Sequence, residues 1–363
     1  MHPPVTEITA NIAAVITEPG HIVLQKRPLP VPGPGQALVR VTRVGICGSD
    51  TAYYSGKATY AIKAPFVMGH EAAGLIESLG PPAEAPASHP FGDAHELVPG
   101  QRVALIPNEA CGRCLECRSG FDNLCSETRY LGSAAVDPHQ DGTLQRYLVL
   151  PVSNLLPLPH SIDDTTAALL EPFAVALHAA RKVSIEGSSV LIVGGGAIGQ
   201  LIAIAARALG AAHITVSDPS ARRIKLAVGH GADAALSPEA VAADLATGAS
   251  FDVVFDASGH PAGVELALKA AKPGSGHVVL VGNLPAGHGL PVQAITRAES
   301  WVTSTFRFSG GLSPALELIK SAQLDIAWLV EESVAFMDIE DAFLLSQRVD
   351  PPLKIQISFP STP

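Results

Sequence analysis

The chain has 363 residues, of which 47% are apolar and 16% charged, so it can bury a large core and is not a wholly disordered protein. Its length predicts about two domains. The formal net charge is −10, with 24 Lys and Arg against 34 Asp and Glu. Nucleic acids and anionic membrane surfaces attract proteins through a positive field, so we expect neither as a partner.

The first part of the chain predicts an irregular β domain over residues 1–160. Residues 36–46 alternate apolar and polar side chains, as a strand with one buried face does. Proline and glycine interrupt the chain at 28–35. The stretch 80–98 is rich in proline and alanine and predicts a long surface loop, after which an apolar segment at 103–106 starts the next strand.

Strands and helices alternate after residue 161, where Ser161–Asp164 has the composition of a helix start. Strands are expected at 188–193, 213–218, 251–259 and 277–283, with helices at 197–210, 221–232 and directly after 259. This alternation, with apolar strands, predicts a parallel, doubly wound α/β sheet over 161–300. We expect residues 301–363 to return to the first domain. The tail within them, 311–363, has one helical segment and then short strand-like segments such as 353–359.

One stretch, 187–206, carries no charge over about twenty residues, which is the length of a membrane span. Three glycines, Gly194–Gly196, divide it into a short β-branched segment and a helical one, so we expect no membrane helix. The first twenty residues contain no basic segment followed by a long apolar run, which predicts no secretory signal and a cytoplasmic protein.

A dinucleotide-binding fingerprint follows the strand at 188–193. The residues Gly194, Gly196 and Gly199, with Ala197 and Ile198 between the last two, form G-x-G-x-x-G at the start of a helix. In this setting the glycines allow a tight turn, the approach of a pyrophosphate to the helix N-terminus, and close helix–strand packing.

The next strand of the fingerprint ends in Asp218, whose carboxylate can accept the ribose hydroxyls of NAD. Arg223 in the following helix supplies a positive charge, so NADP is a possible cofactor as well. The alternative interpretation is an ordinary glycine turn followed by a helix-capping aspartate.

Four of the five cysteines form a cluster with the spacing C-x2-C-x2-C-x7-C: Cys111, Cys114, Cys117 and Cys125. Four thiolates on one short loop can surround a zinc ion tetrahedrally and leave no open position, so we expect a structural zinc in a lobe at 108–127. An iron–sulfur cluster and two disulfides are the alternatives.

A second metal site is suggested by Cys47, by the pair His70 and Glu71, and by Glu171 much further along the chain. One thiolate, one imidazole and one or two carboxylates can bind zinc and leave a position for water or substrate. The spacing alone is weak, because Cys47 could be a small core residue and His70 a buried structural histidine.

The sequence resembles a known family, the zinc-containing medium-chain dehydrogenase/reductases, over essentially its whole length. The matching segments are 45–50, 64–74, 99–105, the four cysteines, 171–179 and the glycine turn. Within the family, the sequence is similar to the polyol branch around sorbitol dehydrogenase. It is more similar still to L-idonate 5-dehydrogenases, and this closer resemblance is carried by the segments 53–71, 129–147, 171–180 and 305–310. The resemblance implies a GroES-like β catalytic domain joined to a Rossmann domain.

The resemblance also implies roles for the candidate residues. Cys47 and His70 match catalytic zinc ligands, and the third ligand is either Glu71 or Glu171, with the other carboxylate completing the shell or holding the zinc-bound water. Ser49 matches a hydroxyl that relays the substrate proton. Alanine stands at position 52, where the family often has a histidine that ends this relay.

On the substrate side, the resemblance implies contacts from Tyr53 and Arg307, and from Phe308, which replaces a tyrosine of sorbitol dehydrogenase. The expected reaction is oxidation of a secondary hydroxyl of a sugar acid or polyol, first of all L-idonate to 5-keto-D-gluconate, with hydride transfer to NAD or NADP. Two zinc ions per subunit and a homodimer or homotetramer are expected. A sorbitol- or xylitol-type polyol dehydrogenase is the alternative, and a non-catalytic nucleotide-binding protein on the same fold is a more distant one.

Overall fold

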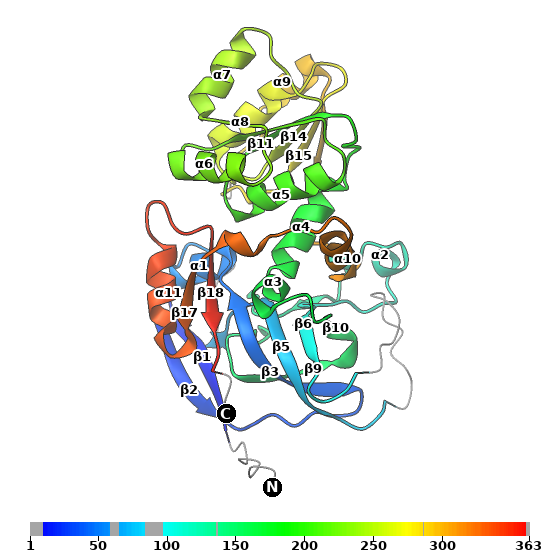
Figure 1. Cartoon of the computed structure of the whole chain (residues 1–363), viewed down its shortest axis with the longest axis vertical. Coiled ribbons are helices and arrows are strands. Elements are labelled where there is room, and N and C mark those ends of the chain that lie inside the picture. The colour runs from blue at the N-terminus through cyan, green and yellow to red at the C-terminus, as the bar shows by residue number, and fades with distance from the viewer. Residues whose placement is uncertain (1–9, 59–64, 84–96, 136, 286, 361–363) are drawn as a thin grey trace. The chain divides into compact units, whose positions relative to one another are not determined.

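The computed structural model describes residues 10–58, 65–83, 97–135, 137–285 and 287–360. The chain forms two compact units (Figure 1). The first unit comprises Met1–Glu171, Gly310–Pro314 and Ile326–Pro363, and the second comprises Pro172–Ser309 and Ala315–Asp325.

The first unit is built mainly of antiparallel strands. Its largest sheet has the order β10-β6-β5-β3-β18-β17, with β9 pairing to β3. The bounds are β3 Gln36–Gly45, β5 Glu71–Leu79, β6 Arg102–Leu105, β9 Tyr147–Pro151, β10 Leu155–Pro157, β17 Val330–Ala335 and β18 Lys354–Ser358. The strand β18, drawn in red in Figure 1, pairs antiparallel with β3, so the last strand of the chain lies in the first unit.

Two smaller sheets complete the β structure of this unit. One has the order β2-β1-β4, with β1 at Asn11–Glu18, β2 at His21–Arg27 and β4 at Phe66–Val67. The other is a hairpin of β7 (Asn108–Glu109) and β8 (Arg129–Tyr130). Because the four-cysteine segment lies between β7 and β8, this hairpin closes the base of the lobe.

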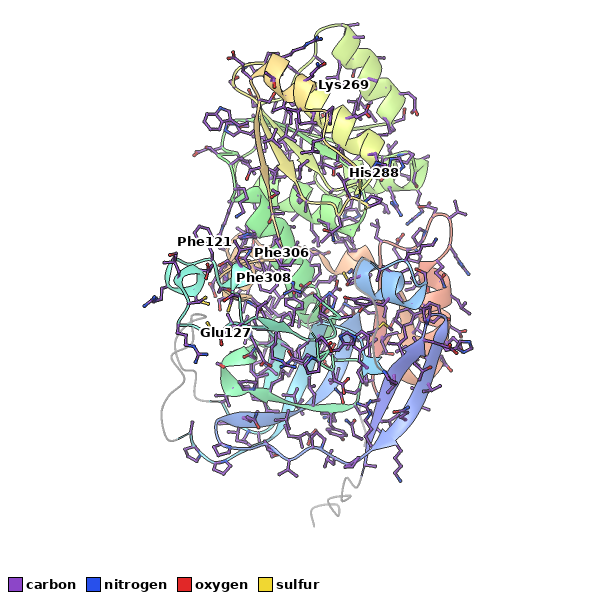
Figure 2. All side chains as sticks on the ribbon, turned by 180° about the vertical axis from the view of Figure 1, so that it is seen from behind. Phe121, Glu127, Lys269, His288, Phe306 and Phe308 are labelled. Carbon is purple, nitrogen blue, oxygen red and sulfur yellow. The ribbon has the colours of Figure 1, made fainter. Side chains whose placement is uncertain are left out.

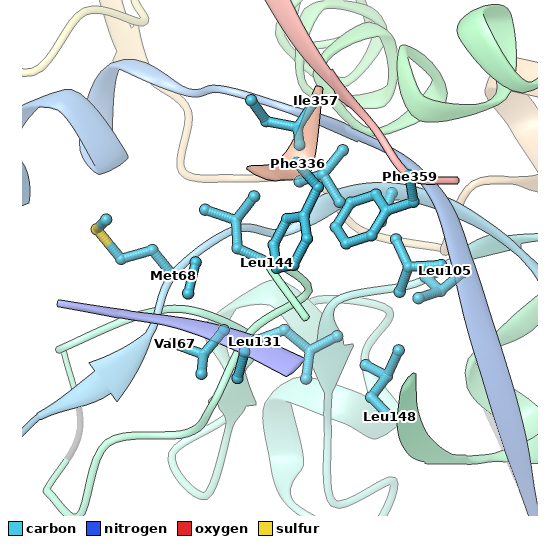
Figure 3. Close-up of a cluster of buried hydrophobic side chains, with 14 of the residues drawn as sticks. Val67, Met68, Leu105, Leu131, Leu144, Leu148, Phe336, Ile357 and Phe359 are labelled. Atoms are coloured by element: carbon cyan, nitrogen blue, oxygen red, sulfur yellow. The ribbon is translucent and has the colours of Figure 1, made fainter. Parts of the chain in front are cut away.

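Short helices surround these sheets: α1 Gly48–Tyr54, α2 Leu115–Arg118, α3 Asp164–Ala168 and α11 Ile339–Ser346, with single 3-10 turns η1 Asp122–Leu124, η2 Val152–Asn154, η3 Ala327–Leu329 and η4 Phe336–Asp338. A core of buried apolar side chains joins the sheets (Figure 3). In it the rings of Phe336 and Phe359 stack with centroids 4.4 Å apart, and Leu144 and Ile357 are fully buried. Apolar burial of this kind is the main stabilising contribution to the fold.

The second unit contains a six-stranded sheet in which every neighbouring pair is parallel, in the order β13-β12-β11-β14-β15-β16. The strands are β11 Ser189–Val193, β12 His213–Ser217, β13 Ala234–Leu236, β14 Val253–Asp256, β15 His277–Leu280 and β16 Trp301–Ser304. The order reverses between β11 and β14, which is the Rossmann arrangement with a switch point beside β11. The predicted α/β fold class is confirmed.

Helices connect these strands: α5 Ala197–Ala208, α6 Ala221–Gly229, α7 Pro238–Ala246, α8 Pro261–Ala270 and α9 Val292–Ala298. Helix α4 (Leu170–Ala180), which begins at the end of the first unit, precedes the sheet, and α10 (Ser313–Ser321) follows it. Helix α5 contacts β11 and β12, and α8 contacts β11 and β14. The glycine turn between β11 and α5 therefore lies at the centre of the sheet.

The division between the units differs from the expected boundaries at 161 and 301. The segment at 161–164 does start a helix, because Asp163 accepts a hydrogen bond from the Thr166 amide at 2.7 Å. That helix, α3, packs on β3, β5 and β6 and so belongs to the first unit. At the other end β16 continues the parallel sheet beside β15, which keeps 301–304 in the second unit.

Three further expectations bear on the fold. The tail contains α11 as well as α10, and not one helical segment as predicted. Most of the predicted loop at 80–98 lies outside the described residues. No helix within the described ranges is long and apolar enough to cross a membrane, and 187–206 divides into β11 and α5 at Gly194, whose φ is +101°.

Candidate active site

Pairing of β3 with β5 brings the first group of metal donors together. Cys47 follows the end of β3, and His70 and Glu71 lie at the start of β5, where Gly45 is the cross-strand partner of Glu71. The ligand atoms of Cys47, His70 and Glu71 all lie within 4.8 Å of one another. A Cβ atom on Gly45 would stand 2.1 Å from a Glu71 oxygen, so glycine leaves space for this carboxylate. Sulfur, imidazole and carboxylate donors in this grouping suit zinc.

A fully buried carboxylate, Asp50, fixes the two loops of this site. It accepts hydrogen bonds from the amides of Cys47, at 2.9 Å, and Gly69, at 3.2 Å. Its Oδ1 lies 3.9 Å from Nδ1 of His70. Burial opposes the charged imidazolium, but the negative charges of Asp50 and Cys47 outweigh burial and raise the pKa of His70 to about 10. A metal ion bound here therefore replaces a proton on His70.

Glu71 has a second partner, which the sequence did not predict. Lys354, the first residue of β18, donates from Nζ to both oxygens of Glu71, at 2.7 and 2.8 Å, and to the Ile46 carbonyl at 3.2 Å. The side chains of Lys354 and Glu71 are only 5% and 1% exposed. Burial opposes the lysine charge, yet Glu71 overcomes this and raises the pKa of Lys354. The only signal in the sequence was a lysine in the apolar strand segment 353–359.

Glu171 stands near the start of α4 and is not one of the three clustered donors. Its Oε1 accepts a hydrogen bond of 2.6 Å from the hydroxyl of Tyr130 in β8. Burial raises the pKa of Glu171, against the opposing effect of His70, and the charge of Glu71 raises it further. Tyr130 is thus a second site residue that was not predicted from the sequence, although it lies in the segment 129–147 that carries the family resemblance.

The helix α1 carries two other predicted residues. Ser49 is exposed in its first turn. Tyr53 is buried instead, with its hydroxyl accepting a hydrogen bond from the Ala134 amide at 3.0 Å and its ring packed edge-on against Phe66. In the structure Tyr53 therefore stabilises the packing of the first unit. Its predicted contact with substrate stays a prediction.

The four cysteines of the lobe also converge. The sulfur atoms of Cys111, Cys114, Cys117 and Cys125 all lie within 4.8 Å of one another, and none of the five cysteines of the chain forms a disulfide. The amides of Cys111, Cys114 and Cys117 donate to the sulfurs of Cys125, Cys111 and Cys114 at 3.3 to 3.4 Å. Such N–H···S bonds stabilise thiolates, and four converging sulfurs fit a tetrahedral metal ion.

The thiol groups of the lobe differ in acidity. Backbone amides of Arg113 and Cys114 lower the pKa of Cys111 to about 7, whereas burial raises the pKa of Cys117 to about 12. Cys117 carries its thiolate form at neutral pH only when a cation compensates its burial. A metal ion held by the four sulfurs would supply that compensation.

The glycine turn of the second unit fits a dinucleotide. A Cβ on Gly199 would stand 1.8 Å from the Gly194 carbonyl oxygen, so helix and strand are packed as closely as predicted. A Cβ on Gly196 would meet only a terminal nitrogen of Arg223, at 3.9 Å, which leaves the start of α5 open. Together with Ala197 and Ile198, these residues present the amides of the helix N-terminus, a site suited to a pyrophosphate.

Asp218 closes the other side of this turn. Its Oδ2 accepts from the Gly195 amide at 2.7 Å and its Oδ1 from the Ser220 amide at 2.8 Å. Arg223 lies 3.7 Å from Oδ2. A carboxylate has about four acceptor positions, so Asp218 keeps the capacity to accept ribose hydroxyls, and Arg223 provides a cation beside them.

Arg307 and Phe308 lie in the second unit, in the segment after β16. Figure 2 labels Phe308 and the neighbouring Phe306. The Arg307 guanidinium stacks over the ring of Phe306 at 4.8 Å, and its φ of +52° is a backbone conformation that non-glycine residues seldom adopt. Phe308 is 2% exposed. Strained residues cluster at functional sites, which is consistent with the predicted role of Arg307.

Comparison with known proteins agrees with this architecture. Residues 33–160 match the alcohol dehydrogenase GroES-like domain, and residues 197–321 match the zinc-binding dehydrogenase domain. The chain is 35% identical to L-idonate 5-dehydrogenase (NAD(P)(+)) of Escherichia coli K12 over 89% of this chain and 91% of that protein. It is 32% identical to sorbitol dehydrogenase of Arabidopsis thaliana, over 96% and 95%.

The chain belongs to the zinc-containing medium-chain dehydrogenase/reductase family. The crystal structure of the Escherichia coli L-idonate 5-dehydrogenase superposes with a TM-score of 0.86 and 31% identity over 97% of this chain and 99% of that one. The predicted family is therefore confirmed, together with the GroES-like and Rossmann folds. Zinc and NAD(P) are the cofactors of this family of polyol and sugar-acid dehydrogenases.

Removal of the Lys354 charge should destabilise the metal-free protein. In Lys354→Met the Glu71 carboxylate stays buried without its partner, a change that typically costs about 3–5 kcal/mol. We expect a clearly lower Tm in thermal unfolding without metal, and a smaller loss with zinc present, because zinc also compensates Glu71. Lys354→Met/Glu71→Gln should recover much of the loss.

The matched control is Lys320→Met, which removes the partner of Glu317 from an exposed pair and should change Tm little. An unchanged Tm in metal-free Lys354→Met would contradict the assigned role of the ion pair.

Zinc binding at the Cys47–His70–Glu71 site should strengthen as pH rises towards 10. Below that value His70 is protonated in the metal-free site, so zinc must displace its proton, and affinity gains about tenfold per pH unit for each displaced proton. Competition with a zinc-buffering chelator, after zinc has been restored to the lobe, measures this dependence.

Asp50→Asn removes the charge that holds the proton on His70 and should shift the same dependence to lower pH. An affinity that stays constant with pH below 10 would refute the assignment of a protonated His70.

Proposed function

We propose that this chain oxidises a secondary hydroxyl of a sugar acid, L-idonate above all, and passes the hydride to NAD or NADP. The single observation that carries the proposal is the convergence of Cys47, His70 and Glu71 at one point of a chain that belongs to the zinc dehydrogenases. The choice of L-idonate rests on the similarity to the Escherichia coli enzyme of that name.

Cys47, His70 and Glu71 would hold the catalytic zinc, whose chemistry when bound is Lewis-acid stabilisation of the substrate alkoxide. Ser49 accepts the proton of the substrate hydroxyl through a hydrogen bond. Because Ser49 is exposed and alanine occupies position 52, the proton passes from Ser49 to solvent without a histidine. Glu171 keeps its second carboxylate oxygen to accept a hydrogen bond from water or from the substrate hydroxyl.

The cofactor binds on the second unit. The amides at Gly196–Gly199 would hold the pyrophosphate, and Asp218 would accept the ribose hydroxyls, which favours NAD. Arg223 beside Asp218 supports the acceptance of NADP. The NAD(P)(+) in the name of the Escherichia coli relative agrees with this dual use.

A second zinc ion per chain is proposed for the four-cysteine lobe, where it would be structural. We also propose a homodimer or homotetramer, since β16 pairs only with β15 in the described part of the sheet and exposes Trp301 along its free edge. A cytoplasmic location suits five cysteines without disulfides.

A polyol dehydrogenase of the sorbitol or xylitol type is the second candidate, supported by the similarity to the Arabidopsis sorbitol dehydrogenase. One or two contacts in the substrate pocket are enough to separate the two substrate classes. The two candidates share the metal site and the cofactor.

A substrate screen tests the proposal. The purified protein is assayed with L-idonate, 5-keto-D-gluconate, D-sorbitol, xylitol and L-threonine, each with NAD and NADP, before and after chelation. We expect the highest kcat/KM on the idonate pair and its loss after chelation. A preference for sorbitol or xylitol would favour the second candidate, and activity on threonine alone would overturn both.

Arg307→Ala tests the recognition of an acidic substrate. A charge-assisted hydrogen bond to a carboxylate is typically worth about 1.5–3 kcal/mol, so KM for an aldonate should rise about 10- to 100-fold, with a much smaller change for a neutral polyol. The control is Lys57→Ala, which removes an exposed cation of the first unit. Equal losses on both substrate classes would remove the reason for assigning Arg307 to the carboxylate.

A further inference from the structure

Tyr130 occupies an unusual position for a residue outside the metal donors. It is the last residue of the two-residue strand β8, paired with Asn108 of β7, and its side chain is almost fully buried. Its ring meets the ring of His70 edge-on with centroids 5.7 Å apart. Its hydroxyl reaches Oε1 of Glu171 at 2.6 Å. One side chain therefore contacts both a metal donor and the carboxylate that lies outside the donor group.

Among the residues that the structure describes, the Tyr130 hydroxyl is the one group that donates a hydrogen bond to the Glu171 carboxylate. A hydroxyl bonded to a buried carboxylate forms a short, charge-assisted bond that is stronger than a neutral one. Since Glu171 is buried, loss of this bond would leave its charge with fewer compensating partners.

The backbone that carries Tyr130 is held firmly. Opposite it, buried Asn108 accepts a hydrogen bond at Oδ1 from the Thr128 hydroxyl at 2.6 Å, and its carbonyl accepts from the Asn154 amide side chain at 3.0 Å. The four-cysteine lobe emerges from this same hairpin, so an ordered lobe keeps β8 in place. These contacts give Tyr130 little freedom to follow Glu171 if that side chain turned towards the metal.

We propose that Tyr130 is a positioning residue that holds Glu171 off the catalytic metal. With Oε1 engaged by the tyrosine hydroxyl, Glu71 remains the third ligand, and the second oxygen of Glu171 is available to water or to the substrate hydroxyl. Lys354 and Tyr130 then have opposite effects on the choice of ligand. Lys354 competes with the metal for Glu71, whereas Tyr130 prevents Glu171 from competing with Glu71 for the metal. This inference rests on the proposed catalytic site, since it assigns Glu171 a place beside the metal.

The test replaces Tyr130 by phenylalanine, which keeps the ring and removes only the hydroxyl. Cobalt(II) is exchanged into the catalytic site with zinc retained in the lobe, and metal analysis confirms this loading. In Tyr130→Phe we expect Glu171 to join the metal, so that the visible d–d bands weaken as the coordination number rises. Replacement of a residue that orients a metal-site group typically costs about 10- to 100-fold, and we expect this loss in kcat with a much smaller change in KM.

Two comparisons make the result specific. Tyr147→Phe is the matched control, because Tyr147 is a fully buried tyrosine of the same unit whose hydroxyl has no hydrogen-bond partner among the described residues. It should leave the spectrum and kcat unchanged. Tyr130→Phe/Glu171→Gln should restore the spectrum of the unsubstituted protein, since an amide is a poor metal ligand.

The outcomes separate this inference from the proposed function. A cobalt spectrum that Tyr130→Phe does not change, or a changed spectrum that persists in the double variant, overturns the positioning role. A spectrum that shifts as expected in a protein inactive on every sugar acid and polyol supports the positioning role and overturns the substrate assignment alone.

Discussion

Pairing of β3 with β5 is the constraint on which the catalytic site depends. It places Gly45 opposite Glu71 and so brings Cys47, at the end of one strand, beside His70 and Glu71, at the start of the other. The consequence is a buried group of charges, with Asp50 and Glu171 close by. Buried charges are tolerated only when they are paired, hydrogen-bonded or bound to a metal, and both glutamates of the site have a partner.

The two glutamates meet it in different ways. Glu71 is neutralised by Lys354 from the last strand of the chain, and Glu171 is bound by Tyr130 from the hairpin below the four-cysteine lobe. In the metal-free site a protonated His70 faces Asp50, and the Lys354 ammonium pairs with Glu71. Cys47, His70 and Glu71 would give up the His70 proton and part of the Lys354 contact to hold a zinc ion, so zinc affinity would depend on pH and on Lys354.

The second unit satisfies a different physical requirement. Its parallel strands end beside a glycine turn in which Gly194 adopts a positive φ and Gly199 packs directly on the Gly194 carbonyl. The amides at the start of α5 remain open, while Asp218 fastens the turn through the Gly195 amide. The site for an anionic cofactor thus consists largely of backbone, which explains why glycines were its main signal in the sequence.

The sequence by itself determined the family, the two fold classes and the local motifs, because these depend on short-range patterns. The four cysteines are close neighbours along the chain, and the glycine turn is read from six residues. The tertiary structure alone decided which groups neutralise the buried carboxylates. Lys354 and Glu71 are joined only by the return of β18 to β3, and Tyr130 reaches Glu171 only because a hairpin closes the lobe. Periodicity and spacing carry no information about such pairs, since the free energy of a buried charge depends on neighbours that the fold brings from distant parts of the chain.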